Sequence, residues 1–207
     1  MLVAVCVMLG LAVGAFANRV IAVMTGKARV RGAALEAAMG LAFGAVGLRV
    51  GWNWALPGFL LFAWTLVVVA VIDACTRRIP NRLTYPLTPA LLALLAVAAL
   101  LNGEPGRAAT ALLGGLGAFG ALLTLALVNP RGMGMGDVKL AAFIGVGLGY
   151  WGWEALVAGM LGGFMLGGLA AIGLLATRLR GRKDLIPFGP YLAAGALLAL
   201  LASGPST

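Results

Sequence analysis

Eight apolar segments, separated by short polar breaks, occupy almost the whole chain and limit what it can fold into. They cover residues 2–24, 34–50, 54–72, 84–101, 109–128, 138–150, 155–176 and 188–203. Crossing the hydrocarbon core of a bilayer, about 30 Å thick, takes roughly 20 helical residues at about 1.5 Å each. Most of the segments are near that length, and the sixth and eighth are short for it. The pattern predicts an all-α, polytopic membrane bundle of about eight transmembrane helices, with residues 1–207 as a single integral membrane domain.

The composition excludes a water-soluble fold and several kinds of catalysis. Apolar residues make up 62% of the chain and charged residues only 10%, against about 45–50% and 25% in soluble domains. The chain has no histidine, which excludes Ser-His-Asp and Cys-His catalysis and histidine-ligated zinc. Its two cysteines, Cys6 and Cys75, lie in or beside apolar segments without a CxxC spacing. We interpret them as small apolar residues and predict no metal site.

The excess of positive charge indicates membrane orientation and no nucleic-acid partner. Only two basic residues, Arg49 and Arg107, fall on one side of an eight-helix arrangement. The other thirteen fall on the opposite side: Arg19, Lys27, Arg29, Arg31, Arg77, Arg78, Arg82, Arg131, Lys139, Arg178, Arg180, Arg182 and Lys183. Lys and Arg concentrate in cytoplasmic loops of membrane proteins. We therefore expect the basic breaks to face the cytoplasm, both termini to be external, and membrane lipid to surround the helices.

Two acidic residues, Asp73 and Asp137, lie at the edges of apolar segments on the basic side. An ionised carboxylate is costly next to hydrocarbon, so acids at such positions suggest function. Structural interpretations also stay open, since Asp73 could pair with Arg77 along a helix and Asp137 could cap the sixth helix. Glu104 and Glu154, by contrast, fall in external breaks, where we expect them to be solvated.

Taken together, Asp73 and Asp137 suit hydrolysis by paired carboxylates. One ionised carboxylate draws a proton from water while the other, protonated, donates to the carbonyl oxygen of a peptide bond. At a separation of about 3 Å the two groups share one proton, and either could be the base. Gly134 and Gly136, just before Asp137, would let the backbone approach a substrate strand closely.

Four motifs in order resemble those of the type IV prepilin leader peptidases, which are GxGD aspartic peptidases of the membrane edge. Residues 14–21 (GAFANRVI) are similar to the first-helix pattern of that family, and Asp73 with residues 79–84 (IPNRLT) resembles its first aspartate motif. Residues 134–140 (GMGDVKL) resemble the second aspartate motif, and residues 186–191 (IPFGPY) the element before the last helix. The resemblance extends over nearly the whole chain.

The resemblance implies an endopeptidase that removes the basic leader from type IV prepilins or pseudopilins at the inner (plasma) membrane, with its active site facing the cytoplasm. Asp73 and Asp137 would be the catalytic pair, and no cofactor would be needed for cleavage. Lys139 could orient Asp137, contact substrate, or simply mark the cytoplasmic side. Prolines 80, 187 and 190 would end helices and shape the cytoplasmic mouth. The residues expected to bind substrate are Pro80, Asn81, Gly134, Gly136, Lys139, Pro187, Phe188 and Gly189.

One departure from the family concerns a second activity. Many members carry a cytoplasmic domain with two CxxC pairs between the first two helices, where this chain has only residues 26–34 and no cysteine. N-methylation of the product, with S-adenosylmethionine as cofactor, is therefore doubtful here. Two other functions are weighed against the peptidase. A proton-coupled transporter predicts acids near mid-span and broken helices, and a membrane protein without activity leaves the four motifs unexplained.

Overall fold

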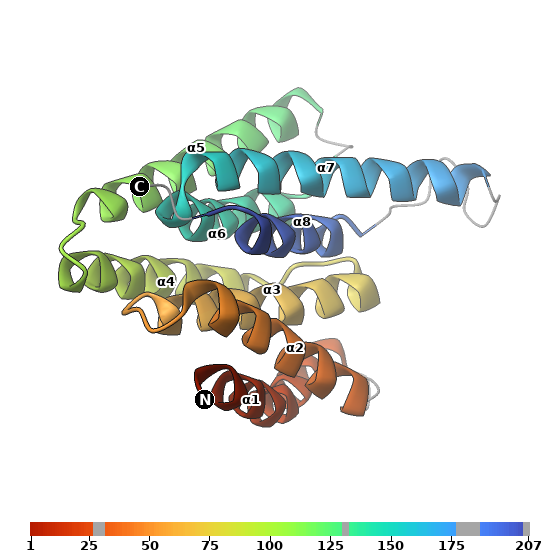
Figure 1. Cartoon of the computed structure of the whole chain (residues 1–207). Helices are drawn as coiled ribbons and strands as arrows, with labels where there is room; N and C mark the ends of the chain where they lie inside the picture. Colours follow the sequence, from red (N-terminus) through yellow and green to blue (C-terminus); the bar gives the residue numbers. More distant parts are fainter. Residues whose placement is uncertain (27–31, 130–132, 177–186, 205–207) are drawn as a thin grey trace.

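Eight α-helices account for nearly all of the described residues (Figure 1). The computed structural model describes residues 1–26, 32–129, 133–176 and 187–204. The helices are α1 (Leu2–Thr25), α2 (Gly32–Val50), α3 (Leu56–Thr76), α4 (Asn81–Leu101), α5 (Gly106–Val128), α6 (Met135–Trp151), α7 (Trp153–Ala176) and α8 (Gly189–Ala202). Each of the eight predicted segments corresponds to one helix, so the all-α prediction is confirmed.

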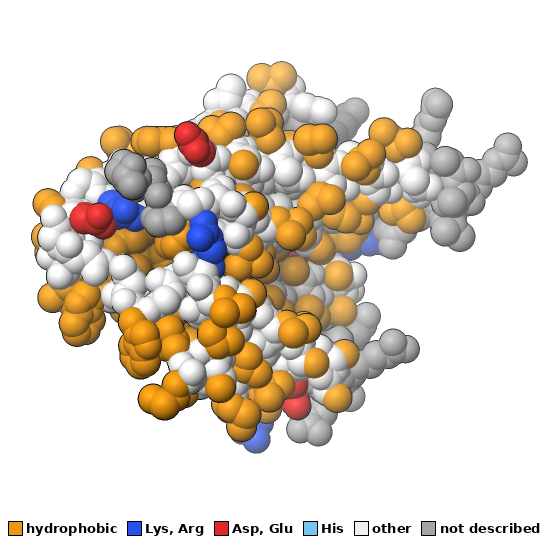
Figure 2. Space-filling model, in the orientation of Figure 1, with side chains coloured by type: hydrophobic (Ala, Val, Ile, Leu, Met, Phe, Trp, Pro, Cys, Tyr) orange, Lys and Arg blue, Asp and Glu red, His pale blue; other side chains and the backbone are white. Residues whose placement is uncertain are grey.

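Six of the helices are long and apolar enough to cross a membrane. They cover Leu2–Thr25, Ala33–Val50, Leu56–Thr76, Asn81–Leu101, Gly106–Val128 and Trp153–Leu174, and Gly189–Ala202 is a shorter apolar helix. The two helices outside the six, α6 and α8, are the two whose segments are short in the sequence. The protein is therefore a multi-pass membrane protein. Figure 2 shows a face that is mostly apolar or uncharged, with several of its few charged side chains gathered at the left end.

Consecutive helices run in opposite directions, so the end of each odd-numbered helix and the beginning of the helix after it lie at one end of the bundle (Figure 1). That end holds the C-terminal ends of α1, α3, α5 and α7 and the N-terminal ends of α2, α4, α6 and α8. Glycines allow the paired helices to approach closely, as is common between membrane helices. A methyl group added at Gly114 of α5, for example, would lie 2.6 Å from the carbonyl oxygen of Gly145 in α6.

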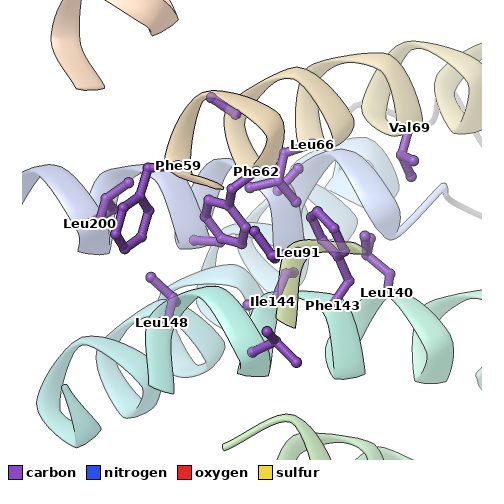
Figure 3. Packing of buried hydrophobic residues seen from close by; sticks show 14 of the residues in the cluster. Phe59, Phe62, Leu66, Val69, Leu91, Leu140, Phe143, Ile144, Leu148 and Leu200 are labelled. Carbon is purple, nitrogen blue, oxygen red and sulfur yellow. The ribbon is translucent and has the colours of Figure 1, made fainter. Parts of the chain in front are cut away.

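Helix α3 lies in the centre of the bundle and packs against α6 through an aromatic and aliphatic core (Figure 3). The rings of Phe62 in α3 and Phe143 in α6 are stacked with their centres 5.5 Å apart. Phe59 packs edge-on against Trp151, the last residue of α6, at 5.1 Å. Within a bilayer such contacts act through close van der Waals packing, because lipid tails are as apolar as the side chains. This core holds the end of α3 beside the beginning of α6.

Candidate active site

Asp73 lies near the C-terminal end of α3 and is only 4% exposed. Its Oδ2 accepts a hydrogen bond of 2.9 Å from the backbone N–H of Gly189, the first residue of α8. The start of a helix carries free N–H groups and a partial positive charge, both of which favour a carboxylate. A methyl group at Gly189 would lie 2.8 Å from the same oxygen, so only glycine leaves room for this contact.

Asp137 lies in the first turn of α6, outside the six helices that are long enough to cross a membrane. Burial raises its pKa to about 6, and the negative charge of Asp73 acts in the same direction, against a hydrogen bond from the backbone of Gly134. The N-cap of α6 is Gly134, three residues before Asp137, the N-cap that the sequence suggests. The interpretation of Asp137 as the N-cap is therefore wrong, and its carboxyl group is held partly buried against Gly134.

The two aspartates line a single pocket of about 270 Å³ at the end of the bundle where α3 ends and α6 begins. The remaining lining residues come from the same two helix ends and the segment after α3: Arg77, Arg78, Ile79, Gly134 and Gly136. The sequence predicts two acids at one depth, and the structure places both in one cavity. A pocket with two carboxyl groups can hold a water molecule and a peptide bond between them, as paired-carboxylate hydrolysis requires.

Arg77 does not neutralise Asp73, contrary to the helical ion pair left open by the sequence. Within the described part of the chain, no ion pair joins these two side chains. Arg77 instead ends α3 in the left-handed conformation, with φ 55° and ψ 33°, and its backbone N–H donates to the carbonyl oxygen of Asp73 at 2.7 Å. The sequence analysis does not predict Arg77 and Arg78 as site residues. Their position just after an aspartate at the end of an apolar segment could have indicated that they lie beside the site.

Lys139 contacts Asn81 rather than Asp137. Its Nζ donates a hydrogen bond of 2.8 Å to Asn81 Oδ1 and lies 4.7 Å from the centre of the Tyr85 ring. Two of the residues expected to bind substrate are thus partners of each other, in the second turn of α6 and the first turn of α4. Gly134 and Gly136 do line the pocket, and Gly136 lies against Ile79.

The prolines of the site begin helices instead of ending them, which corrects the prediction. Pro80 is the N-cap of α4 and Pro190 the second residue of α8, where the missing N–H of proline is tolerated. Phe188 is the N-cap of α8, and its ring packs against that of Phe164 with centres 5.1 Å apart. Pro187 is half-buried beside it. Neither residue lines the pocket of the two aspartates.

Among the described residues, no acidic or thiol group other than Asp73 and Asp137 lines this pocket. Glu104 forms an ion pair of 2.6 Å with Arg107 at the opposite end of the bundle, and Glu154 is exposed there in the first turn of α7. Cys6 and Cys75 are free thiols. No three His, Cys, Asp or Glu side chains gather as a possible metal site within the described residues. Several residues that carried the orientation prediction lie outside the described residues: Lys27, Arg29, Arg31, Arg131, Arg178, Arg180, Arg182 and Lys183.

The fold and the site together define a multi-pass helical membrane protein with two acids, one buried and one partly buried, in a pocket at one end of its bundle. The family model for the type IV leader peptidase family matches residues 60–172, which include both aspartates. The chain therefore belongs to the type IV leader peptidase family. No solved structure matches it.

Curated relatives from several bacteria carry the name prepilin leader peptidase/N-methyltransferase. The protein from Aeromonas hydrophila is 34% identical over 76% of this chain and 53% of its own length. The Bacillus subtilis protein is 33% identical over 77% of this chain and 61% of its own. The Burkholderia pseudomallei protein is 38% identical over 83% and 54%, respectively. The chain thus spans about half to three fifths of the length of these relatives. None of the matches supports the transporter alternative.

Proposed function

We propose that this protein is an aspartic endopeptidase that removes the leader from type IV prepilins or pseudopilins at the edge of the membrane. The observation that carries the proposal is the pocket shared by Asp73 and Asp137. The family and the names of the relatives support the same activity. We further propose that all 207 residues act as one membrane peptidase domain, and the packing of every described helix against at least one other supports this.

In the proposed mechanism, a water molecule between the two carboxyl groups attacks the carbonyl carbon of the scissile peptide bond. Asp73, held by the N–H of Gly189, acts as the base that takes a proton from the water. Asp137 supplies a proton to the carbonyl oxygen, because its pKa, raised to about 6, makes its protonated form far more accessible near neutral pH than that of an ordinary aspartate. The resulting intermediate then breaks at the C–N bond: Asp73 passes the proton that it took from water to the leaving amine nitrogen, and Asp137 takes back a hydroxyl proton as the carboxyl product forms.

The proposed orientation places the pocket at the cytoplasmic face of the inner membrane, with both termini external. Arg77, Arg78, Arg82 and Lys139 are all at the end of the bundle that holds the aspartates, as cytoplasmic loops require. A prepilin with a basic leader on the cytoplasmic side and an apolar helix in the bilayer would present its cleavage site at this depth.

The described residues around the aspartate pocket do not fit a dedicated S-adenosylmethionine site. Helix α1 ends at Thr25 and α2 begins at Gly32, so the connection between them is too short for the cytoplasmic domain of many family members. The aspartate pocket, at about 270 Å³, is below the roughly 300–1,000 Å³ of most small-molecule sites. We therefore propose cleavage without N-methylation. Mass spectrometry of the processed pilin tests this, and one added methyl group per chain, formed by purified enzyme with the cofactor, would contradict it.

The peptidase proposal is tested by co-expressing the protein with a type IV prepilin and following leader removal as a mobility shift. Asp73→Asn and Asp137→Asn keep the side-chain shape but remove the ionisable group, so each should abolish cleavage while the protein still accumulates in the membrane. Glu154→Gln, an exposed acid at the other end of the bundle, is the matched control and should cleave normally. Substantial cleavage by either Asp variant would show that the pair is wrongly assigned.

A further inference from the structure

The bond between Lys139 and Asn81 joins two helices next to the aspartate pocket without entering it. Lys139 lies in α6, two residues after Asp137, and Asn81 is the first residue of α4. The hydrogen bond between Lys139 Nζ and Asn81 Oδ1 is 2.8 Å long, and the pocket lining includes neither residue. Any effect of Lys139 and Asn81 on the reaction would therefore act through the backbone that carries the aspartates.

The backbone segment between α3 and α4 contacts the helix of each aspartate. It leaves α3 four residues after Asp73 and reaches α4 at Asn81, passing Ile79 on the way. Ile79 packs so closely on Gly136 that a methyl group there would lie 2.9 Å from the Ile79 Cβ. The segment is thus attached to the first turns of α6 at two points, once through Ile79 on Gly136 and once through Asn81 on Lys139. These attachments fix the beginning of α6 relative to the end of α3.

Lys139 is oriented to fill this role rather than to pair with Asp137. Residues two positions apart in an α-helix are separated by about 200° around its axis. The side chains of Asp137 and Lys139 therefore leave α6 on different sides. The ammonium group also lies over the ring of Tyr85 in α4, which adds a cation–π contact to the hydrogen bond. Both contacts of Lys139 are therefore with α4.

Building on the proposed function, we propose that Lys139 and Asn81 are positioning residues, whose bond holds Asp137 at its working distance from Asp73. Paired-carboxylate hydrolysis depends on the separation of the two groups, and a misplacement of about 1 Å can reduce a rate by about a hundredfold. This role differs from the substrate contact that the sequence suggests for both residues. A substrate contact would change KM, whereas loss of alignment changes kcat.

The test measures kcat and KM of the full-length enzyme with a purified prepilin for four variants. Lys139→Met keeps the apolar stem over Tyr85 and removes the donor, and Asn81→Ala removes the acceptor. Each should lower kcat by about ten- to a hundredfold with KM changed by less than about twofold. The kcat of the double variant should be within about twofold of that of the slower single variant, because both changes break the same hydrogen bond. Asn81→Asp keeps an acceptor for the ammonium group and should recover most of the rate lost in Asn81→Ala.

Arg82→Met is the matched control, since it removes a neighbouring positive charge from the same turn of α4, and its kcat should stay within about twofold of the parent. Membrane accumulation and thermal stability of every variant show whether folding has changed. A normal kcat in Lys139→Met, additive losses in the double variant, or an effect on KM alone would each overturn the positioning role. Asp137→Asn is assayed alongside. If it still cleaves, the proposed function fails, whereas an inactive Asp137→Asn with a fully active Lys139→Met removes only the positioning proposal.

Discussion

The backbone N–H of Gly189 lies 2.9 Å from Oδ2 of Asp73, so the beginning of α8 forms part of the aspartate site. This contact joins residues 116 positions apart in the sequence and uses a main-chain group that any residue except proline possesses. What makes position 189 special is the lack of a side chain, since the carboxyl group occupies the space of a Cβ atom. The last helix therefore holds a catalytic group in the proposed mechanism.

We expect Gly189→Ala to lower cleavage by about a hundredfold or more, because the added methyl group, 2.8 Å from Asp73 Oδ2, would displace the carboxyl group. The measurement is the rate of leader removal by equal amounts of membrane-inserted enzyme. Gly168→Ala is the matched control, since a Cβ at this position of α7 meets nothing within 4 Å, and it should cleave normally. Equal rates for the two variants would mean that Asp73 tolerates displacement.

The sequence predicts most of the fold because each helix has its own apolar segment. Hydropathy is a local property, and the short segments of α6 and α8 are visible in it as well. That Asp73 and Asp137 lie at the same end of the bundle is also predictable, since each stands at the edge of an apolar segment on the basic side. The helix starts are harder to predict: α6 begins at Met135, before its apolar run, because Gly134 serves as the cap.

The contacts within the site could not be read from the sequence. Gly189, Asn81 and Lys139 look like substrate-binding residues as parts of motifs, yet one holds Asp73 and the other two contact each other. These contacts join helices that are distant in sequence, and their partners depend on how the helices are rotated. Hydropathy carries no information about that rotation, particularly where several helices are apolar on all sides.

The raised pKa of Asp137 predicts how cleavage depends on pH. A group with a pKa of about 6 is mostly protonated below pH 6 and loses its proton as the pH rises through that value. Since Asp137 is the proposed proton donor, kcat/KM should fall between pH 6 and pH 8, toward about tenfold per pH unit. The measurement uses purified enzyme in detergent at constant ionic strength. A rate that rises over this interval would assign the ionised form of Asp137 to the reaction.

The left-handed conformation of Arg77 predicts a stabilising substitution beside the active site. Residues with a Cβ atom adopt φ 55° at a cost of about 1 kcal/mol, whereas glycine adopts it readily. Arg77→Gly should therefore raise the thermal unfolding temperature of the detergent-solubilised protein, by an amount corresponding to about 0.5–1 kcal/mol. Arg78→Gly, at a neighbouring position without positive φ, should not. A lower stability of Arg77→Gly would reveal a contact of the guanidinium group that outweighs the relief of the backbone.

The proposed orientation predicts which ends of the helices can be labelled from outside the cell. In a background with Cys6→Ala and Cys75→Ala, a cysteine replacing exposed Trp52, between α2 and α3, should react with a membrane-impermeant thiol reagent added to intact cells. A cysteine replacing exposed Arg78, beside the aspartate pocket, should react only after the membrane is permeabilised. Trp52 comes before α3 and Arg78 comes after it, so one experiment reports on both sides of the membrane. Labelling of Arg78→Cys in intact cells would place the aspartate pocket outside and would overturn the cytoplasmic assignment of the cleavage site.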